Sequence, residues 1–132
     1  MANRERPLSP HLTVYRWQVQ MMTSILHRAT GVVLTFGSLL VAWGLIALSA
    51  GEGAWNDFIG FARSPVGFLI LFGWTWAFAY HLLNGIRHLV QDAGKAVQIK
   101  QFVLSSWIAV IGSLVLTVVL WVAVILQRGG AA

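Results

Sequence analysis

The sequence contains no cysteine and very little charge. The absence of cysteine among its 132 residues excludes disulfide bonds, cysteine-ligated zinc, iron–sulfur clusters and thiol catalysis within this chain. Charged residues make up 10% of the chain and hydrophobic residues 58%, whereas soluble domains average about 25% charged residues. This composition predicts an integral membrane protein.

Acidic residues are especially scarce, with four against nine lysines and arginines, which leaves a formal net charge of +5. Such an excess can indicate a nucleic-acid-binding protein. The basic residues, however, lie at the ends of apolar segments and do not gather on a soluble face. We therefore expect the lipid bilayer, and not nucleic acid, to be a partner of this chain.

Three long apolar runs are present, each about long enough to cross a hydrocarbon core of roughly 30 Å. They predict an all-α fold with three transmembrane helices at about residues 24–50, 64–90 and 102–127. Ser64 is placed to cap the second helix, and Pro65 suits its first turn. We expect all 132 residues to form a single membrane-anchor domain.

The connections between these runs are distinctive. Glycine and polar residues after position 50 indicate a loop, with a short interfacial helix around residues 55–61. A basic loop is predicted over residues 91–101. Residues 1–20 form a polar arm in which Pro7 and Pro10 oppose helix formation.

The distribution of positive charge predicts the orientation. Three spans place the arm and the second loop on the same side, which carries seven of the nine basic residues. These are Arg4, Arg6, Arg16, Arg28, Arg87, Lys95 and Lys100. The positive-inside rule then predicts a cytoplasmic N-terminus. The arm resembles neither a signal peptide nor a transit peptide, which favours a bacterial inner membrane over a mitochondrial one.

The segment HLLNGIRHLVQD at residues 81–92 brings polar groups into the end of the second apolar run. On a helix, His81, Asn84, Gly85, His88 and Asp92 share one face. His81 and His88 lie roughly 10 Å apart along the axis, so they cannot ligate one iron from opposite sides of a flat macrocycle, but they can serve one cofactor at two points. The alternative is that the histidines form hydrogen bonds between helices beside a packing glycine.

A second polar patch, Ser24, His27 and Arg28, begins the first helix. In the predicted orientation this patch gathers with Arg87, His88 and Asp92, at the end of the second helix, into a polar rim near the cytoplasmic interface. His81 lies roughly 9 Å deeper. A deep histidine below a basic rim suits haem b, because the histidine can ligate iron while the rim receives the propionates. Simpler roles are also open: Arg28 as a snorkelling arginine, Ser24 as a helix cap and Asp92 in a salt bridge or a helix-end hydrogen bond.

Two pairs of motifs in the sequence together resemble one family. The first pair is RPLSPHL at residues 6–12 with SILHRATG at 24–31, and the second is HLLNGIRHL at 81–89 with DAG at 92–94. Together they resemble the cytochrome b membrane-anchor subunit of succinate dehydrogenase, respiratory complex II, and the likeness covers nearly the whole chain. Gln91 departs from the pattern, because the family usually has a bulky aromatic residue or methionine there.

The resemblance implies that His81 is an axial ligand of haem b and that a second small anchor subunit supplies the other axial histidine. It places His27, Arg28 and His88 near the haem propionates. It also assigns Ser24 and Arg28 to the site of ubiquinone or another quinone. The implied partners are an iron–sulfur subunit and a flavoprotein that oxidises succinate. This chain would then be a subunit of succinate:quinone oxidoreductase with no catalytic residue for succinate oxidation.

Chemistry supports these assignments but leaves two other functions open. The Ser24 hydroxyl can hydrogen-bond a quinone carbonyl, and Arg28 can stabilise negative charge that develops on a quinone oxygen. The chain could instead be a haem-free structural anchor, in which the histidines only join helices. It could also be a small transporter subunit that uses His81 in a proton relay.

Overall fold

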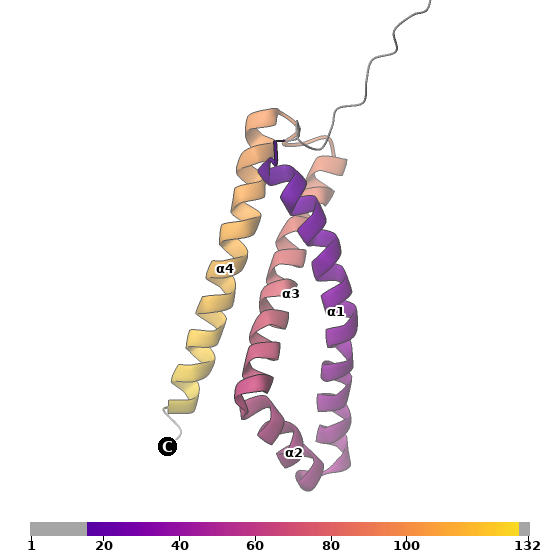
Figure 1. Ribbon diagram of the computed structural model, residues 1–132, viewed down its shortest axis with the longest axis vertical. Coiled ribbons are helices and arrows are strands. Elements are labelled where there is room, and N and C mark those ends of the chain that lie inside the picture. The colour runs from indigo at the N-terminus through magenta and orange to yellow at the C-terminus, as the bar shows by residue number, and fades with distance from the viewer. Residues whose placement is uncertain (1–15, 130–132) are drawn as a thin grey trace, which may run out of the picture.

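The computed structural model describes residues 16–129, with side chains as far as Gln127, so the motif at residues 6–12 and most of the predicted arm lie outside the described part. The described chain forms four helices: α1 (Val19–Ala50), α2 (Glu52–Arg63), α3 (Pro65–Asp92) and α4 (Ile99–Gly129). The three long helices run side by side, with α3 between α1 and α4 (Figure 1). The short helix α2 lies at the end where α1 joins α3, and the connection from α3 to α4 lies at the other end.

Each of the three long helices is long and apolar enough to cross a membrane, over Val19–Ala50, Pro65–Asp92 and Ile99–Gln127. The predicted all-α fold with three long apolar helices is therefore confirmed. The short helix expected around residues 55–61 is also present, as part of α2.

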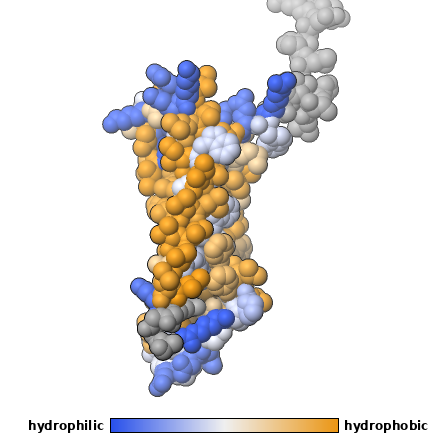
Figure 2. Space-filling model, turned by 90° about the vertical axis from the view of Figure 1, so that its left-hand side faces the viewer, coloured by the Kyte–Doolittle hydropathy of each residue, from blue (hydrophilic) through white to orange (hydrophobic). Residues whose placement is uncertain are grey.

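The packing of side chains is inverted relative to a water-soluble bundle. Large apolar side chains such as Phe36 and Leu126 point outward, and Figure 2 shows an apolar band between two hydrophilic ends. The buried positions are mostly small residues, among them Gly37, Ala47, Ala77, Ala109, Ser106, Ser113 and Thr117. Small residues let helix backbones approach closely, which is how helices associate in lipid.

Gly37 lets α1 fit closely against α3. A methyl group at this position would overlap the indole ring of Trp74, which lies across the helix from α3. The absence of a side chain at Gly37 therefore allows the two helices to meet with a large aromatic ring between them. This contact holds α1 and α3 together on the side of α3 that also carries His81.

The ends of α3 follow local sequence rules, although one predicted boundary is wrong. Ser64 Oγ accepts a hydrogen bond of 3.1 Å from the Gly67 amide, and Pro65 is the first helical residue, as expected. At the other end Gly94 has a φ of 72°, and the amides of Gly94 and Lys95 bond to the carbonyls of Gln91 and Val90, a Schellman motif. The basic loop is consequently shorter than the predicted residues 91–101, because α3 continues to Asp92 and α4 already begins at Ile99.

Candidate functional site

His81 lies on α3 with its ring half-buried against α1. Its Nδ1 atom is 3.1 Å from the backbone carbonyl oxygen of His27 and 3.2 Å from the hydroxyl oxygen of Thr30. A carbonyl oxygen can only accept a hydrogen bond, so Nδ1 must carry the hydrogen and donate it. In the neutral ring Nε2 is then unprotonated, and no described residue hydrogen-bonds to it.

Three imidazole rings meet at this point. The rings of His27 and His81 stack with their centroids 3.9 Å apart and their planes at 12°, and the ring of His88 lies 5.2 Å from that of His27. His27 thus lies directly against His81, whereas the sequence predicted it in a rim about 9 Å above. The two stacked rings leave no space for a flat macrocycle between them.

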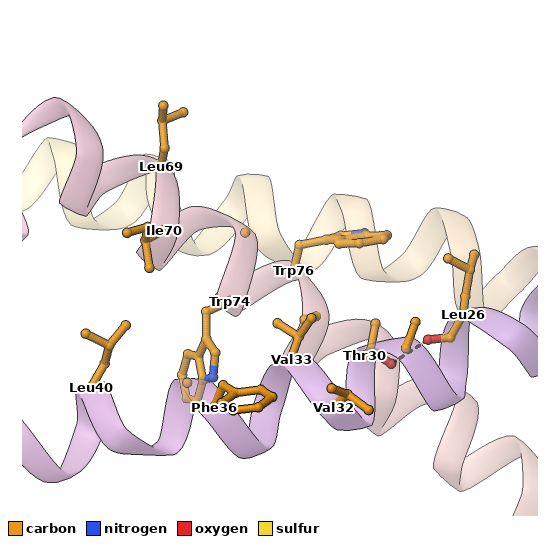
Figure 3. A pocket seen from close by; sticks show the side chains of 14 residues that line it. Leu26, Thr30, Val32, Val33, Phe36, Leu40, Leu69, Ile70, Trp74 and Trp76 are labelled. Atoms are coloured by element: carbon orange, nitrogen blue, oxygen red, sulfur yellow. Dashed lines mark hydrogen bonds between the residues drawn. The ribbon is translucent and has the colours of Figure 1, made fainter.

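Two hollows adjoin the histidines. One, of about 420 Å³, is lined by His27, His81, His88 and Gly85 together with apolar side chains of α3. The other, of about 600 Å³, lies between α1 and α3 and is almost wholly apolar (Figure 3). Thr30 lines the apolar hollow and contacts His81, which lines the first, so this pair links the walls of the two hollows. The arrangement offers an unprotonated nitrogen, polar ring edges and a broad apolar surface together.

Comparison with known proteins identifies the family. Residues 2–120 match the family described as succinate dehydrogenase/fumarate reductase transmembrane subunit. The chain is 47% identical over 113 residues to the succinate dehydrogenase cytochrome b556 subunit of Paracoccus denitrificans, covering 86% of this chain and 87% of that protein. The chain belongs to this family.

Other relatives extend the likeness to mitochondria. The cytochrome b556 subunit of Rickettsia felis is 42% identical over 118 residues, which cover 89% of this chain and 92% of that protein. The mitochondrial cytochrome b560 subunit of Sus scrofa is 39% identical over 111 residues, which cover 80% of this chain and 64% of that protein. Membership in this transmembrane family agrees with the three apolar helices and establishes the chain as a membrane protein.

Ser24 and Arg28, the residues predicted to contact a quinone, lie one turn apart on α1 but line neither hollow. Arg28 is exposed and Ser24 is half-buried. The interpretation of Ser24 as a helix cap is wrong, because α1 begins at Val19 with Gln18 as its cap residue. Every other serine and threonine in the described helices hydrogen-bonds a backbone carbonyl through its hydroxyl, whereas the Ser24 hydroxyl bonds to no described residue.

Arg87 does not join the histidine cluster, and Asn84 reaches it only through His88. Asn84 is fully buried between His88 and Arg87. Its Nδ2 atom is 3.3 Å from His88 Nε2, and its Oδ1 atom is 3.3 Å from Arg87 Nη1. Arg87 turns toward α4, where Nε donates to Ser105 Oγ at 3.1 Å and the guanidinium lies 4.4 Å from the centre of the Phe102 ring. Arg87 is therefore excluded from the predicted rim and forms part of the bundle interior.

The remaining polar residues at this end were either misjudged or missed. Asp92 is exposed and forms no ion pair with any described residue, so the expected salt bridge is not found there. Thr30 and Gly31 end the motif SILHRATG but were given no role from the sequence, yet Thr30 contacts the His81 ring and Gly31 lies against it. Tyr80 was given no role from the sequence either, but it is fully buried and donates to the Thr23 carbonyl at 3.0 Å. The spacing of Thr30 three residues after His27 is the one signal that indicated a shared face.

Proposed function

We propose that this chain is the haem b-binding membrane anchor of a succinate:quinone oxidoreductase, and that it forms part of the ubiquinone-reduction site. The observation that carries the proposal is the state of His81. Its Nδ1 is engaged by the His27 carbonyl, its Nε2 is left unprotonated, and its side chain lines a hollow. A metal-bound histidine typically donates its other N–H to a carbonyl in this way.

The residues around His81 fit a haem. Haem supplies a redox-active iron in an apolar ring with two anionic propionates, and its potential depends on the axial ligands and the surrounding polarity. His81 Nε2 is the proposed axial ligand, and the hollow that His81 lines, with apolar side chains of α3 around it, suits the ring. His27 Nδ1 is buried without a hydrogen-bond partner in the described chain, which leaves a donor position for a propionate. We assign the contact with a propionate also to His88, which lines the hollow beside His27, and to Arg28, which follows His27 on α1.

Neither of the other two histidines that the structure describes is placed to be a second axial ligand. The His27 ring lies flat against His81, so it cannot coordinate the same iron from the opposite side of a macrocycle. His88 lies beside His27 and not opposite His81. We therefore propose a second small anchor subunit that supplies the other axial ligand and covers the open side of the cavity.

The proposed quinone contacts are Ser24 and Arg28. The Ser24 hydroxyl is free within the described chain to donate to a quinone carbonyl, and the exposed Arg28 guanidinium can stabilise charge on a quinone oxygen during reduction. Both residues lie near the start of α1, at the end of the bundle where α3 joins α4. That end carries most of the basic residues and is the one we assign to the cytoplasm.

The remaining assignments follow from this orientation. The flavoprotein and the iron–sulfur subunit would dock at the cytoplasmic end, where electrons can reach the quinone. The flavoprotein oxidises succinate, and this chain contributes no residue to that reaction. The proposed location is a bacterial inner membrane, with the N-terminus in the cytoplasm.

A reduced-minus-oxidised spectrum of the purified assembly tests the proposal. We expect a b-type band at a stoichiometry of one haem per flavin, together with succinate–quinone reductase activity. An assembly with reductase activity but no b-type band would favour a haem-free anchor. Proton-coupled solute flux without reductase activity would favour a transporter subunit.

A further inference from the structure

We infer that Thr30 is a positioning residue that holds His81 in the tautomer and orientation required of a metal ligand. This inference rests on the proposed role of His81. It concerns the hydroxyl of Thr30, which lies buried between α1 and α3 on the opposite side of the imidazole from the free nitrogen.

The direction of the hydrogen bonds follows from the number of hydrogens available. Thr30 Oγ1 is 2.8 Å from the Leu26 carbonyl oxygen (Figure 3). It is also 3.0 Å from the His27 carbonyl oxygen, and both carbonyls can only accept. The single hydroxyl hydrogen is therefore used within α1, and Oγ1 presents a lone pair to His81 Nδ1 at 3.2 Å. The His81 N–H thus faces two acceptors, the Thr30 hydroxyl and the His27 carbonyl.

The opposite tautomer is disfavoured at this position. Without its hydrogen, Nδ1 would direct a lone pair at the carbonyl oxygen of His27, and the contact would become repulsive. With the hydrogen on Nδ1, Nε2 is unprotonated and available to a metal. The Thr30 contact also strengthens the donation of electrons from the ring, because hydrogen-bonding the distal N–H raises the basicity of a histidine ligand.

The orientation of the ring is restricted from two further sides. One face stacks on His27, and Cε1 lies against Gly31, where an added Cβ would come within 3.2 Å of it. The ring therefore cannot turn over without losing both acceptors at Nδ1. The Thr30 hydroxyl fixes the direction in which the His81 N–H points. Neither the stacking on His27 nor the contact with Gly31 fixes that direction.

The test compares Thr30→Val with Thr30→Ser in the intact complex. Valine keeps the shape and removes the hydroxyl oxygen, while serine keeps the oxygen. The readouts are the haem-to-flavin ratio, the midpoint potential by redox titration and the low-temperature electron paramagnetic resonance of the oxidised haem. We expect Thr30→Val to shift the potential in the positive direction, to move the largest g value and to weaken haem retention roughly 10- to 100-fold. Thr30→Ser should behave as wild type.

A matched control is available on the same helix. Thr35 Oγ1 bonds the Gly31 carbonyl at 3.0 Å, so it makes the same kind of bond four residues back, but its side chain is exposed. Thr35→Val should leave all three readouts unchanged. Thr30→Ala, which removes the hydroxyl without the branched methyl, should reproduce the effect of valine even if the valine variant assembles poorly.

The results for the Thr30 variants decide whether its hydroxyl positions His81. Full haem with unaltered potential and resonance in Thr30→Val and Thr30→Ala would overturn the inference. Equal shifts in Thr30→Ser and Thr30→Val would also overturn it, because packing and not the hydroxyl would be responsible. His81→Leu in the intact complex separates the proposed role of His81 as a ligand from the role of Thr30 in positioning it. If that variant keeps the wild-type spectrum, the ligand assignment itself is wrong, whereas a bleached spectrum with an unchanged Thr30→Val overturns the role of Thr30 alone.

Discussion

The two sides of α3 treat polar groups in different ways. Toward α4, Arg87, Asn84 and Ser105 are joined by hydrogen bonds within the chain. Toward α1, His81 is bound through one nitrogen only, and His27 Nδ1 is buried without a partner in the described residues. The first side joins helices, whereas the second side has both space and unused hydrogen-bonding capacity beside it.

This difference indicates which polar residues of a membrane bundle are functional. Unsatisfied polar groups in hydrocarbon are costly, so a chain that uses polar groups only for structure pairs them internally. The α4 side meets this expectation around Arg87 and explains a buried arginine without invoking a ligand, although Arg87 Nη2 and Trp121 Nε1 have no partner among the described residues. The α1 side departs from it at an imidazole, the side chain most used as a ligand.

The largest expected effect comes from His81→Leu. Removing the proposed axial nitrogen should bleach or strongly shift the b-type band of the assembled complex, measured as a reduced-minus-oxidised spectrum. Some succinate–quinone reductase activity should remain, because the proposed quinone contacts lie elsewhere. The control on the other side of α3 is Ser105→Ala, which should keep the wild-type spectrum. An unaltered band in assembled His81→Leu would show that the two sides do not differ as proposed.

Arg28→Leu should have the next largest effect. The effect should fall on succinate–quinone turnover and not on the b-type band. Losing one well-placed donor to developing charge typically lowers a rate by about 10²–10³. We expect succinate–quinone turnover to fall in this range, while succinate oxidation with a soluble artificial acceptor stays near normal. The two assays on one membrane preparation make the measurement.

Arg63 provides the matched control for Arg28. It is also exposed, but it lies at the end of α2, at the opposite end of the bundle. Arg63→Leu should leave both activities unchanged. Near wild-type quinone turnover in Arg28→Leu would make Arg28 an ordinary interfacial arginine and would remove it from the proposed site.

Arg87→Leu should affect stability instead of catalysis. It leaves Asn84 Oδ1 and Ser105 Oγ without their donor in the interior, and a buried group left unsatisfied costs about 1–3 kcal/mol. We expect a lower Tm for the detergent-solubilised complex, with normal turnover below that temperature. A loss of turnover at full thermal stability would contradict the structural role and bring Arg87 back into the functional rim.

The fold was largely predictable because its signals are local or compositional. Three charge-free runs predict three long helices, and Ser64 with Pro65 predicts the start of α3. The end of α3 was misjudged because Gln91 and Asp92 appear loop-like by polarity. The residue that decides where the helix ends is Gly94, which adopts the positive φ of a Schellman motif and so terminates α3 after Asp92.

The candidate site was predictable only in part, because the rotation of each helix is decided by packing. The sequence placed Asn84 and His81 on one face, but residues three apart on a helix differ in direction enough that Asn84 points into the interior. The stacking of His27 on His81 depends on how α1 and α3 are aligned along their axes, which the glycine at position 37 and the Trp74 ring help to determine. No pattern within a single helix carries this information.

The smallest effect is expected from Ser24→Ala. The Ser24 hydroxyl bonds to no described residue, so its removal should not disturb α1, and the neutral hydrogen bond it offers a quinone is worth only about 0.5–1.5 kcal/mol. We expect a roughly 2- to 10-fold increase in the KM for quinone, with kcat and thermal stability nearly unchanged. Ser38→Ala is the control, because Ser38 is exposed on the same helix and its hydroxyl already bonds the Thr35 carbonyl. An equal KM in the two variants would show that the free hydroxyl of Ser24 is incidental, and the proposed quinone site would then rest on Arg28 alone.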